Sequence, residues 1–355
     1  MLALCKKAGV SAVPTGKAHG TVTVRLNAHT YEVTTLRRDV ETDGRHAVVD
    51  FRASWQEDAA RRDFTINALY VNAEAQLFDC EGGVHDLENG VVRFIGDPDA
   101  RLQEDVLRFL RFFRFHARYA KGVFDAPSLA ACLAHKSRLP TLSKERVLAE
   151  CRRLLAGPNV LPCLQLWREE GIWALLGQAS PTGKGCEVSL DRLKGRMHKE
   201  LTPPSWLVVL KAVFGRSKPV FLQSRQDQRH WLALDIAVEA VEDDLVDEGA
   251  LLRSLRLTAL SFPDLVVSDW LWLAVARAYH DACITEKEAA LLLQKLIPRS
   301  DLIQPMPCAA DDLLALGFRR DARLGKALKT LARWWIEENY RVTREELLQK
   351  AAKLL

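Results

Sequence analysis

The sequence predicts an α+β protein, in which a β-rich opening segment is followed by a much longer helical region. Residues 20–36 alternate apolar and polar side chains in two β-branched runs separated by Asn27, Ala28 and His29, a pattern that predicts a hairpin of half-buried strands. Beyond Pro98 the apolar residues repeat at the spacing of amphipathic helices. The 355 residues are 48% hydrophobic and 27% charged, which excludes a disordered chain and a peptide-like fold.

Further elements follow in order along the chain. The apolar runs over residues 64–71 and 90–95 each predict a strand. A helix capped beside Pro98 is expected to continue to about Tyr119, because its apolar side chains keep helical spacing. Beyond it nearly everything is expected to be helical, apart from an extended loop over the Gly-, Lys- and Ser-rich residues 181–194.

Composition and charge exclude several classes of protein. Fifty Lys and Arg against 46 Asp and Glu give a net charge of +4, which is too small by itself to indicate a polyanionic partner. The eight cysteines include no Cys-x-x-Cys pair, so zinc-finger spacing is absent and reduced thiols are expected. The sequence shows no signal peptide and no apolar run near the ~18–20 residues of a membrane span. A cytoplasmic protein is therefore expected.

The densest group of polar residues lies in the segment DAARRDFTINAL. It contains Asp58, Arg61, Arg62, Asp63 and Asn67. Two adjacent guanidinium groups can bind a triphosphate through forked hydrogen bonds, while neighbouring carboxylate and amide groups can bind ribose hydroxyls. A buried salt-bridge network between Arg and Asp would need the same residue types, so the residues alone leave both interpretations open.

A second group of charges lies on the helix after Pro98. Arg108, Arg111 and Arg114 stand three residues apart and Arg118 follows, so these side chains share one stripe of a helix. Residues 101–121 contain six basic residues and two acidic ones. The opposite side is expected to be buried and carries Phe109, Leu110, Phe112, Phe113 and Phe115. A solvated charged face is the alternative.

Asp105 and Arg108 are expected to lie one helical turn apart. The carboxylate only accepts hydrogen bonds and the guanidinium only donates them, so the pair can read a base edge. Cytosine and adenine present an amino donor beside an unprotonated ring nitrogen, whereas uracil and guanine present the opposite order. A simple intrahelical ion pair, worth only ~0.3–0.5 kcal/mol, is the alternative.

Several segments in order carry a resemblance to a known family. They are HGTVTV, YEVTTLRRD, DGRHAVV, AARRDFTINALY, FDCEGGVHDL, EDVLRFLRFFRF and LSKERVLAE. With these segments the chain from His19 to Glu150 resembles the class II CCA-adding tRNA nucleotidyltransferases, which share their head and neck with bacterial poly(A) polymerases. Ordered motifs at compatible spacing are more specific than any single one. Cys80 stands where the family commonly has proline, and beyond about residue 160 only helical character is shared.

The resemblance implies a domain organisation and a reaction. It implies an incomplete nucleotidyltransferase α/β head over residues 1–75, a neck that recognises the base over 76–140, and an all-helical body and tail that bind RNA over 141–355. The reaction implied for the complete form of the protein is addition of CMP and AMP to the 3′ end of tRNA from CTP and ATP, with Mg²⁺ as cofactor. The helical part is expected to hold the tRNA acceptor arm by its shape and phosphates.

The same resemblance implies roles for individual residues. Nucleotide-binding roles fall on Arg61, Arg62, Asp63, Asn67, Asp105, Arg108, Arg111 and Arg114. The first four are expected at the sugar and phosphates, the next two at the base edge, and the last two along the triphosphate or bracing the base-reading pair. Phosphate or loop roles fall on Arg37, Asp43 and Arg45. Glu32 stands where such sheets often add a third metal-binding carboxylate, and an exposed strand residue is the equal alternative.

One motif of the family is not found in the sequence. The family holds its metal ions with an Asp-x-Asp pair on a strand after a Gly-Gly turn, and the chain is expected to begin just after that strand. The adjacent carboxylates at 243–244 and 311–312 are expected to be helix caps or solvated charges instead. Two alternatives to CCA addition therefore stay open, namely a poly(A) polymerase and a catalytically inactive module that binds RNA or nucleotide.

Overall fold

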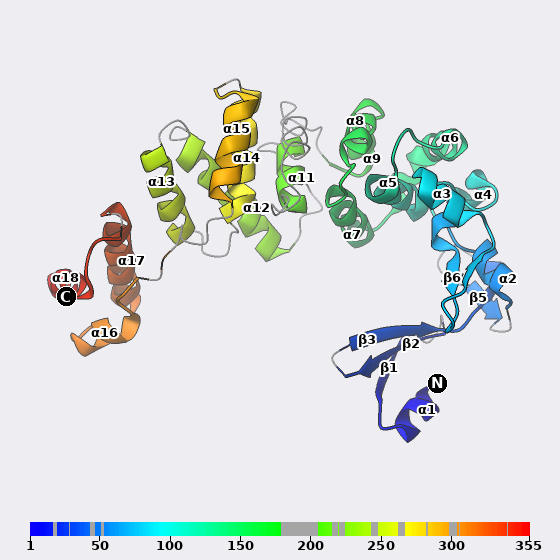
Figure 1. The fold of residues 1–355 in the computed structure, drawn as a ribbon, viewed down its shortest axis with the longest axis horizontal. Helices are drawn as coiled ribbons and strands as arrows, with labels where there is room; N and C mark the ends of the chain where they lie inside the picture. The colour runs from blue at the N-terminus through cyan, green and yellow to red at the C-terminus, as the bar shows by residue number, and fades with distance from the viewer. Residues whose placement is uncertain are drawn as a thin grey trace. The chain divides into compact units, whose positions relative to one another are not determined.

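The computed structural model describes residues 1–16, 20–27, 29–42, 47–50, 53–178, 205–214, 219, 224–242, 248–261, 267–281, 283–297, 304, 306–338 and 340–355. The chain forms two compact units, Met1–Gly177 and Gln178–Leu355 (Figure 1). None of the helices in these described residues is long and apolar enough to cross a membrane. The domain boundaries expected at residues 75 and 140 stay a prediction, and the loop expected over 181–194 lies outside the described residues.

The first unit opens with a short helix and two small antiparallel sheets. The first sheet has the strand order β1-β2-β3, and the second pairs β4 with β5. The bounds are α1 Leu2–Lys7, β1 Ser11–Gly16, β2 Thr21–Leu26, β3 His29–Thr34, β4 Arg38–Thr42 and β5 Ala47–Asp50. Strands β2 and β3 pair without a break from Thr21 opposite Thr34 to Leu26 opposite His29. The predicted hairpin is therefore confirmed.

The strand predicted over residues 64–71 is wrong in its first half. A short helix, α2 (Trp55–Ala60), is followed by a 3₁₀ turn, η2 (Thr65–Asn67), and only then by β6 (Leu69–Val71), which pairs with β7 (Leu77–Asp79). The turn forms because the Asp63 carboxylate accepts hydrogen bonds from the Phe64 backbone N–H and the Asn67 side chain, which offers the backbone an alternative to strand pairing.

No strand forms over residues 90–95 either. After α3 (Gly83–Asn89), which ends at Gly90 in the left-handed region, the chain makes only one isolated bridge, between Phe64 and Phe94. Apolar residues in this run are buried all the same, among them Val92, Phe94 and Ile95. A short buried apolar run fits a strand and a packed irregular segment equally well, which explains the wrong prediction.

The long helix expected after Pro98 is broken in two. It consists of α4 (Pro98–Glu104) and α5 (Leu107–Tyr119), with Asp105 between them in an extended conformation at φ −152° and ψ 109°. The Asp105 carboxylate accepts a hydrogen bond from the Leu107 backbone N–H at 3.0 Å. This contact is typical of an aspartate that caps the start of a helix, and it explains why the helix restarts there.

Helix α5 is the core element of the first unit. Its side chains Phe109, Leu110, Phe112 and Phe113 have no exposed surface, and it packs against α7 (Lys144–Leu155) and α8 (Leu161–Glu169). The buried apolar side is thus confirmed for these four residues. Phe115 differs from the prediction, since it is half-buried on the basic side, under the Arg111 and Arg114 guanidiniums at 5.5 and 4.2 Å. Placing Arg over an aromatic face adds a cation–π attraction.

His116 lies on the buried side of α5, stacked on Phe124 with the ring centroids 3.8 Å apart. Burial lowers its pKa from 6.5 to about 4. Between these pH values the unfolded chain binds a proton that the folded chain does not, so the free energy of unfolding falls as pH drops from about 6.5 to about 4. We expect His116→Phe to remove this loss, about 3 kcal/mol in all. Denaturant unfolding at about pH 7 and about pH 4.5 measures it, and an unchanged pH slope in the variant contradicts it.

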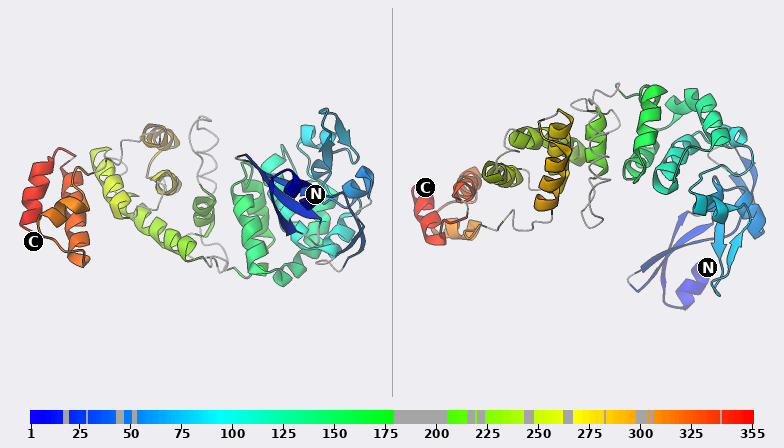
Figure 2. Two further views of the ribbon diagram at one scale, coloured as in Figure 1. Left: turned by 90° about the horizontal axis from the view of Figure 1, so that it is seen from below. Right: turned by 45° about the horizontal axis from the view of Figure 1, so that its top comes forward.

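Helices make up the rest of the described chain. The first unit continues with α6 Ala126–His135, η3 Lys136–Thr141 and α9 Ile172–Leu175. The second unit is helical in its described residues (Figure 2), as the sequence predicts. Its helices are α11 Trp206–Phe214, α12 Arg225–Glu242, α13 Glu248–Ser261, α14 Val267–His280, α15 Glu286–Leu296, α16 Ala310–Ala315, α17 Ala322–Glu337 and α18 Arg344–Ala352. Helix α13 contacts both α12 and α17.

Candidate nucleotide-binding site

An open cavity of about 480 Å³ lies in the first unit between the segment that follows α2 and the start of α5. Its lining residues are Arg61, Arg62, Asp63, Asn67, Asp105, Leu107, Arg108, Arg111 and Phe115. Seven of the eight predicted nucleotide-binding residues are among them. Four guanidinium groups outnumber two carboxylates, so the cavity is electropositive and suits a polyphosphate ligand.

Asp58 fixes the two adjacent arginines at one edge of this cavity. Its carboxylate is 1% exposed. One oxygen accepts from Arg61 Nη2 at 2.5 Å, and the other accepts from Arg62 Nη2 at 3.0 Å. The same carboxylate accepts from the Arg37 backbone N–H at 3.2 Å and from the Tyr70 hydroxyl at 2.8 Å. One buried carboxylate thus orients two guanidiniums side by side.

These contacts keep Asp58 charged. Burial alone would raise its pKa, but the hydrogen bonds from Arg61, Tyr70, Arg37 and Arg62 outweigh it and lower the pKa to about 2. Burial and the bond to Asp58 raise the pKa of Tyr70 to about 12. At neutral pH the carboxylate is therefore ionised and the phenol keeps its proton, which is the arrangement that holds both arginines.

Asp63 connects the cavity to helix α5. Its Oδ2 accepts from Arg111 Nε at 2.5 Å, while Oδ1 accepts from Asn67 Nδ2 at 2.9 Å. The Asp63 side chain is 8% exposed. Because the carboxylate is engaged on both oxygens, it sets the position of Arg111 and the orientation of the Asn67 amide. This salt-bridge network is the interpretation that the sequence left open beside nucleotide binding. The structure confirms the network, and nucleotide binding by the same residues stays a prediction.

The expected continuous helix from Asp105 to Arg108 is wrong, and so is the alternative of an ion pair between these two side chains, whereas the base-reading role stays a prediction. Asp105 lies in the break before α5 and pairs through Oδ2 with Arg146 Nη2 at 2.6 Å. Arg108 bonds to the Glu104 carboxylate and donates to the Arg101 carbonyl oxygen at 2.7 Å. Both still line the cavity. The sequence argument failed because it assumed continuous helix geometry at Asp105.

Arg114 lies behind the cavity rather than in its lining. Its guanidinium pairs with the Glu150 carboxylate of α7 at 3.0 Å, with the two side chains 12% and 6% exposed. It also lies over the Phe115 ring. Burial lowers the pKa of Arg114, and the nearby carboxylate compensates for the lost hydration. Neither contact involves Asp105 or Arg108, so the predicted role of Arg114 along the triphosphate or beside the base-reading pair stays a prediction.

Glu32 and Arg37, the other predicted site residues that the structure describes, are not part of the cavity lining. Glu32 is exposed on β3 opposite Thr23. Arg37 meets the site through its backbone, which donates to Asp58 and accepts from Arg61 Nε at 2.9 Å. Asp43 and Arg45 lie outside the described residues, as do Asp243 and Asp244. Asp312 caps α16 by accepting from the Ala309 N–H and pairs with Arg344, as expected of a helix cap.

Sequence reasoning missed four residues that shape the site. Glu104 and Arg146 hold the predicted base-reading side chains, Tyr70 holds Asp58, and Phe115 forms part of the lining. Arg146 lies inside LSKERVLAE, a segment that carried part of the resemblance, but its partner 41 residues away leaves no signal in local spacing. Such long-range pairs are set by how α7 packs on α5.

Comparisons with known proteins identify the family. The family model described as "Poly A polymerase head domain" matches residues 3–93. The mitochondrial CCA tRNA nucleotidyltransferase 1 of Danio rerio is 32% identical over 365 residues, covering 98% of this chain and 79% of the relative. The human protein of that name is 32% identical over 95% of this chain and 76% of its own length. These relatives identify the chain as a nucleotidyltransferase.

Within that class, the chain belongs to the class II CCA-adding tRNA nucleotidyltransferases. The resemblance drawn from the sequence motifs is therefore confirmed. A CCA-adding enzyme of Latilactobacillus sakei is 29% identical over 96% of this chain and 84% of its own length.

Solved structures share the fold. The crystal structure of the Bacillus stearothermophilus CCA-adding enzyme in complex with CTP superposes with a TM-score of 0.61 at 22% identity, over 97% of this chain and 83% of that one. A tRNA nucleotidyltransferase complexed with a primer tRNA and an incoming ATP analog gives a TM-score of 0.57 at 20% identity, over 83% and 85%. The α+β fold with a small β head and a helical remainder is thus confirmed.

Proposed function

We propose that this protein adds CMP and AMP to the 3′ end of tRNA, with CTP and ATP as donors. Its membership of the CCA-adding family supports the reaction. The observation that carries the assignment to particular residues is the cavity, because it brings seven residues from two separate sequence segments into one electropositive site. Relatives named for CTP and primer tRNA complexes share the fold.

The arginines at the cavity edge would bind the triphosphate. Arg61 and Arg62 are both held by the Asp58 carboxylate, and Arg111 is held by Asp63. Guanidiniums fixed in this way lose little conformational entropy on binding and offer forked donors to phosphate oxygens. The Asn67 amide, fixed by Asp63, is available for a ribose hydroxyl. Such positioning lowers the entropic cost of bringing the nucleotide to the acceptor.

Asp105 and Arg108 would read the base from the other wall. Each side chain is preoriented by its own partner, Arg146 for the carboxylate and Glu104 for the guanidinium. A carboxylate oxygen has two lone pairs and a guanidinium has five N–H groups, so both keep capacity for a base. The proposed match to the amino group and ring nitrogen of cytosine or adenine therefore does not require that Asp105 and Arg108 lie on one continuous helix.

We also propose Mg²⁺ as the cofactor, as the family resemblance implies. In the described part of the chain no three His, Cys, Asp or Glu side chains gather as a metal-binding group, and Glu32 stands alone on β3. We therefore assign no residue of the described chain to the metal and derive no step through it. The cytoplasmic location stays a prediction, because the vertebrate relatives are named as mitochondrial proteins.

Incubation of the protein with tRNA lacking its terminal CCA, CTP, ATP and Mg²⁺ tests the proposal. We expect two C residues and then one A residue to be added, read by sequencing of the product ends. An A tail of unlimited length would identify a poly(A) polymerase. Bound tRNA and CTP without any added nucleotide would identify an inactive binding module. Either of the last two results contradicts the proposed reaction.

A further inference from the structure

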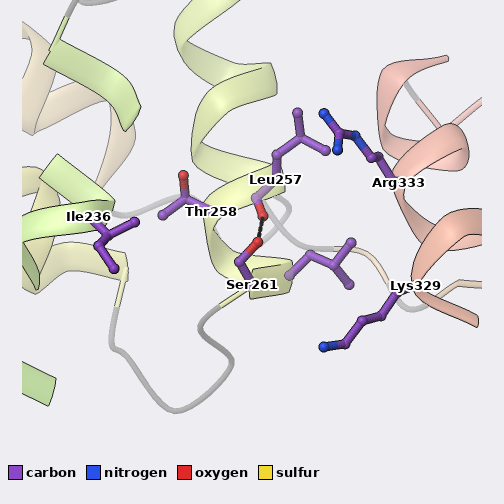
Figure 3. A pocket seen from close by; sticks show the side chains of 7 residues that line it. Ile236, Leu257, Thr258, Ser261, Lys329 and Arg333 are labelled. Atoms are coloured by element: carbon purple, nitrogen blue, oxygen red, sulfur yellow. Dashed lines mark hydrogen bonds between the residues drawn. The ribbon is translucent and has the colours of Figure 1, made fainter. Parts of the chain in front are cut away.

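The exposed aromatic side chains among the described residues all belong to the first unit. They are Tyr31, Trp55, Phe78 and Tyr119. In the second unit, a cavity of about 410 Å³ between α12, α13 and α17 is lined by aliphatic, hydroxyl and cationic side chains such as Leu257, Ser261 and Arg333 (Figure 3). Aromatic surface on which a nucleobase can stack is therefore offered by the first unit.

Trp55 and Phe78 form a pair of parallel rings at the protein surface. Trp55 is the first residue of α2, and Phe78 lies on β7. Their ring centroids are 6.5 Å apart and the ring planes differ by 9°. The two residues are 43% and 44% exposed. Large apolar side chains that gather on a surface mark an interaction site, whereas single scattered ones do not. The pair is therefore a candidate contact surface.

The local structure holds both rings in place. A capping box, in which Ser54 and Glu57 exchange hydrogen bonds, fixes the start of α2. Phe78 is paired with Tyr70 across the β6–β7 ladder, and the Tyr70 ring meets the Trp55 ring edge-on at 4.8 Å. A platform that is fixed before binding loses little conformational entropy when a ligand stacks on it.

This aromatic row continues into the nucleotide-binding cavity. The guanidinium of Arg62, which lines the cavity, lies 5.7 Å from the centre of the Tyr70 ring. The Tyr70 hydroxyl in turn donates to Asp58, which holds Arg62. One ring thus separates Trp55 from an arginine proposed to bind the triphosphate. In the proposed reaction the 3′ end of the RNA must meet the incoming nucleotide, so its last unpaired bases have to lie close to this cavity.

We propose that Trp55 and Phe78 bind an unpaired base at the 3′ end of the RNA acceptor by stacking. The inference rests on the proposed function, which supplies the RNA and places its 3′ end at the cavity. Unpaired RNA bases are commonly bound on aromatic side chains, and loss of one such stack weakens binding by about 5- to 150-fold, largely independent of which base it is. A platform that accepts any base suits an acceptor whose last nucleotide changes from one addition to the next.

The test compares two RNA hairpins with the same stem as ligands of the full chain, one blunt and one with an unpaired 3′ extension of two nucleotides. Trp55→Leu keeps an apolar side chain but removes the ring. We expect it to weaken binding of the extended hairpin by about 5- to 150-fold and to leave binding of the blunt hairpin unchanged. Phe78→Leu should act in the same direction, and Trp55→Phe should restore most of the affinity. The KM for CTP should stay at the parent value, which separates a lost base contact from a displaced Tyr70.

Leu77→Ala is the matched control, because it removes a similarly exposed apolar side chain from the opposite face of the same hairpin. Its affinity for both RNAs should equal that of the parent. An extension made of abasic nucleotides should bind the parent and Trp55→Leu equally. Unchanged affinity in Trp55→Leu, or an equal loss for the blunt and the extended RNA, overturns the platform and leaves CCA addition intact. A parent protein that binds neither RNA and adds no nucleotide to tRNA overturns both proposals.

Discussion

Asp58→Asn is expected to lower kcat/KM for CTP and ATP by about 100-fold or more, equal to about 3 kcal/mol. Asp58 orients Arg61 and Arg62 and also bonds to Tyr70. Asparagine keeps the shape but loses the charge, and its amide nitrogen donates hydrogen bonds as the guanidiniums do. The two arginines would then lose their common anchor, and the loss should appear mainly in the KM for nucleotide.

Tyr70→Phe is the matched control for this prediction. It removes one hydrogen bond from the same carboxylate and leaves both arginine contacts in place. A hydrogen bond from a neutral donor to a charged acceptor is worth about 1.5 to 3 kcal/mol at most. We therefore expect kcat/KM to fall less than in Asp58→Asn. Thermal unfolding of both variants shows whether the protein is folded. A folded Asp58→Asn protein with unchanged nucleotide kinetics would refute the anchoring role.

Arg108→Ala is expected to reduce the preference for CTP and ATP over UTP and GTP by about 10- to 100-fold. A well-placed pair of hydrogen bonds to a base discriminates by about 1–3 kcal/mol, and Arg108 lines the cavity where the base edge is proposed to lie. Binding of tRNA should change little, because the residue belongs to the nucleotide cavity. Competition between the four nucleoside triphosphates measures the preference.

Arg118→Ala is a matched control on the same helix, since Arg118 is exposed and lies outside the cavity lining. Its nucleotide preference should equal that of the parent. Arg146→Ala, which frees Asp105 from its partner at 2.6 Å, should fall between the two. Selectivity in Arg108→Ala that matches the parent would remove the base-reading hypothesis, and it would leave the phosphate-binding arginines as the only part of the site supported by the cavity.

The sequence predicted well where local pattern decides structure. The β2–β3 hairpin follows from strict alternation, and the buried side of α5 follows from the spacing of Phe109, Phe112 and Phe113. The family motifs located seven of the cavity residues. These successes share a cause, because periodicity and motif order can both be read from the sequence without knowing the tertiary contacts.

Two of the errors arose where one aspartate side chain overrode a periodic pattern. Asp63 turns the predicted strand into η2, and Asp105 breaks the predicted helix. The carboxylate of an aspartate can bond to the nearby backbone and end or bend a helix or strand. The spacing of the apolar residues does not indicate which aspartates do so. The partners Arg146 and Glu150 come from a distant helix and depend on packing. Their pairing could not be read from the sequence.

The bend at Asp105 lies apart from the apolar core of the first unit. Asp105 lies outside both helices, whereas the Phe-rich side of α5 supplies the core. If the bend reads the base as proposed, substitutions there alter which nucleotide is accepted and leave the apolar core intact, at the cost of one helix cap and one ion pair. After a gene duplication, two copies of such a protein can therefore diverge in the nucleotide they add while natural selection keeps one shared architecture.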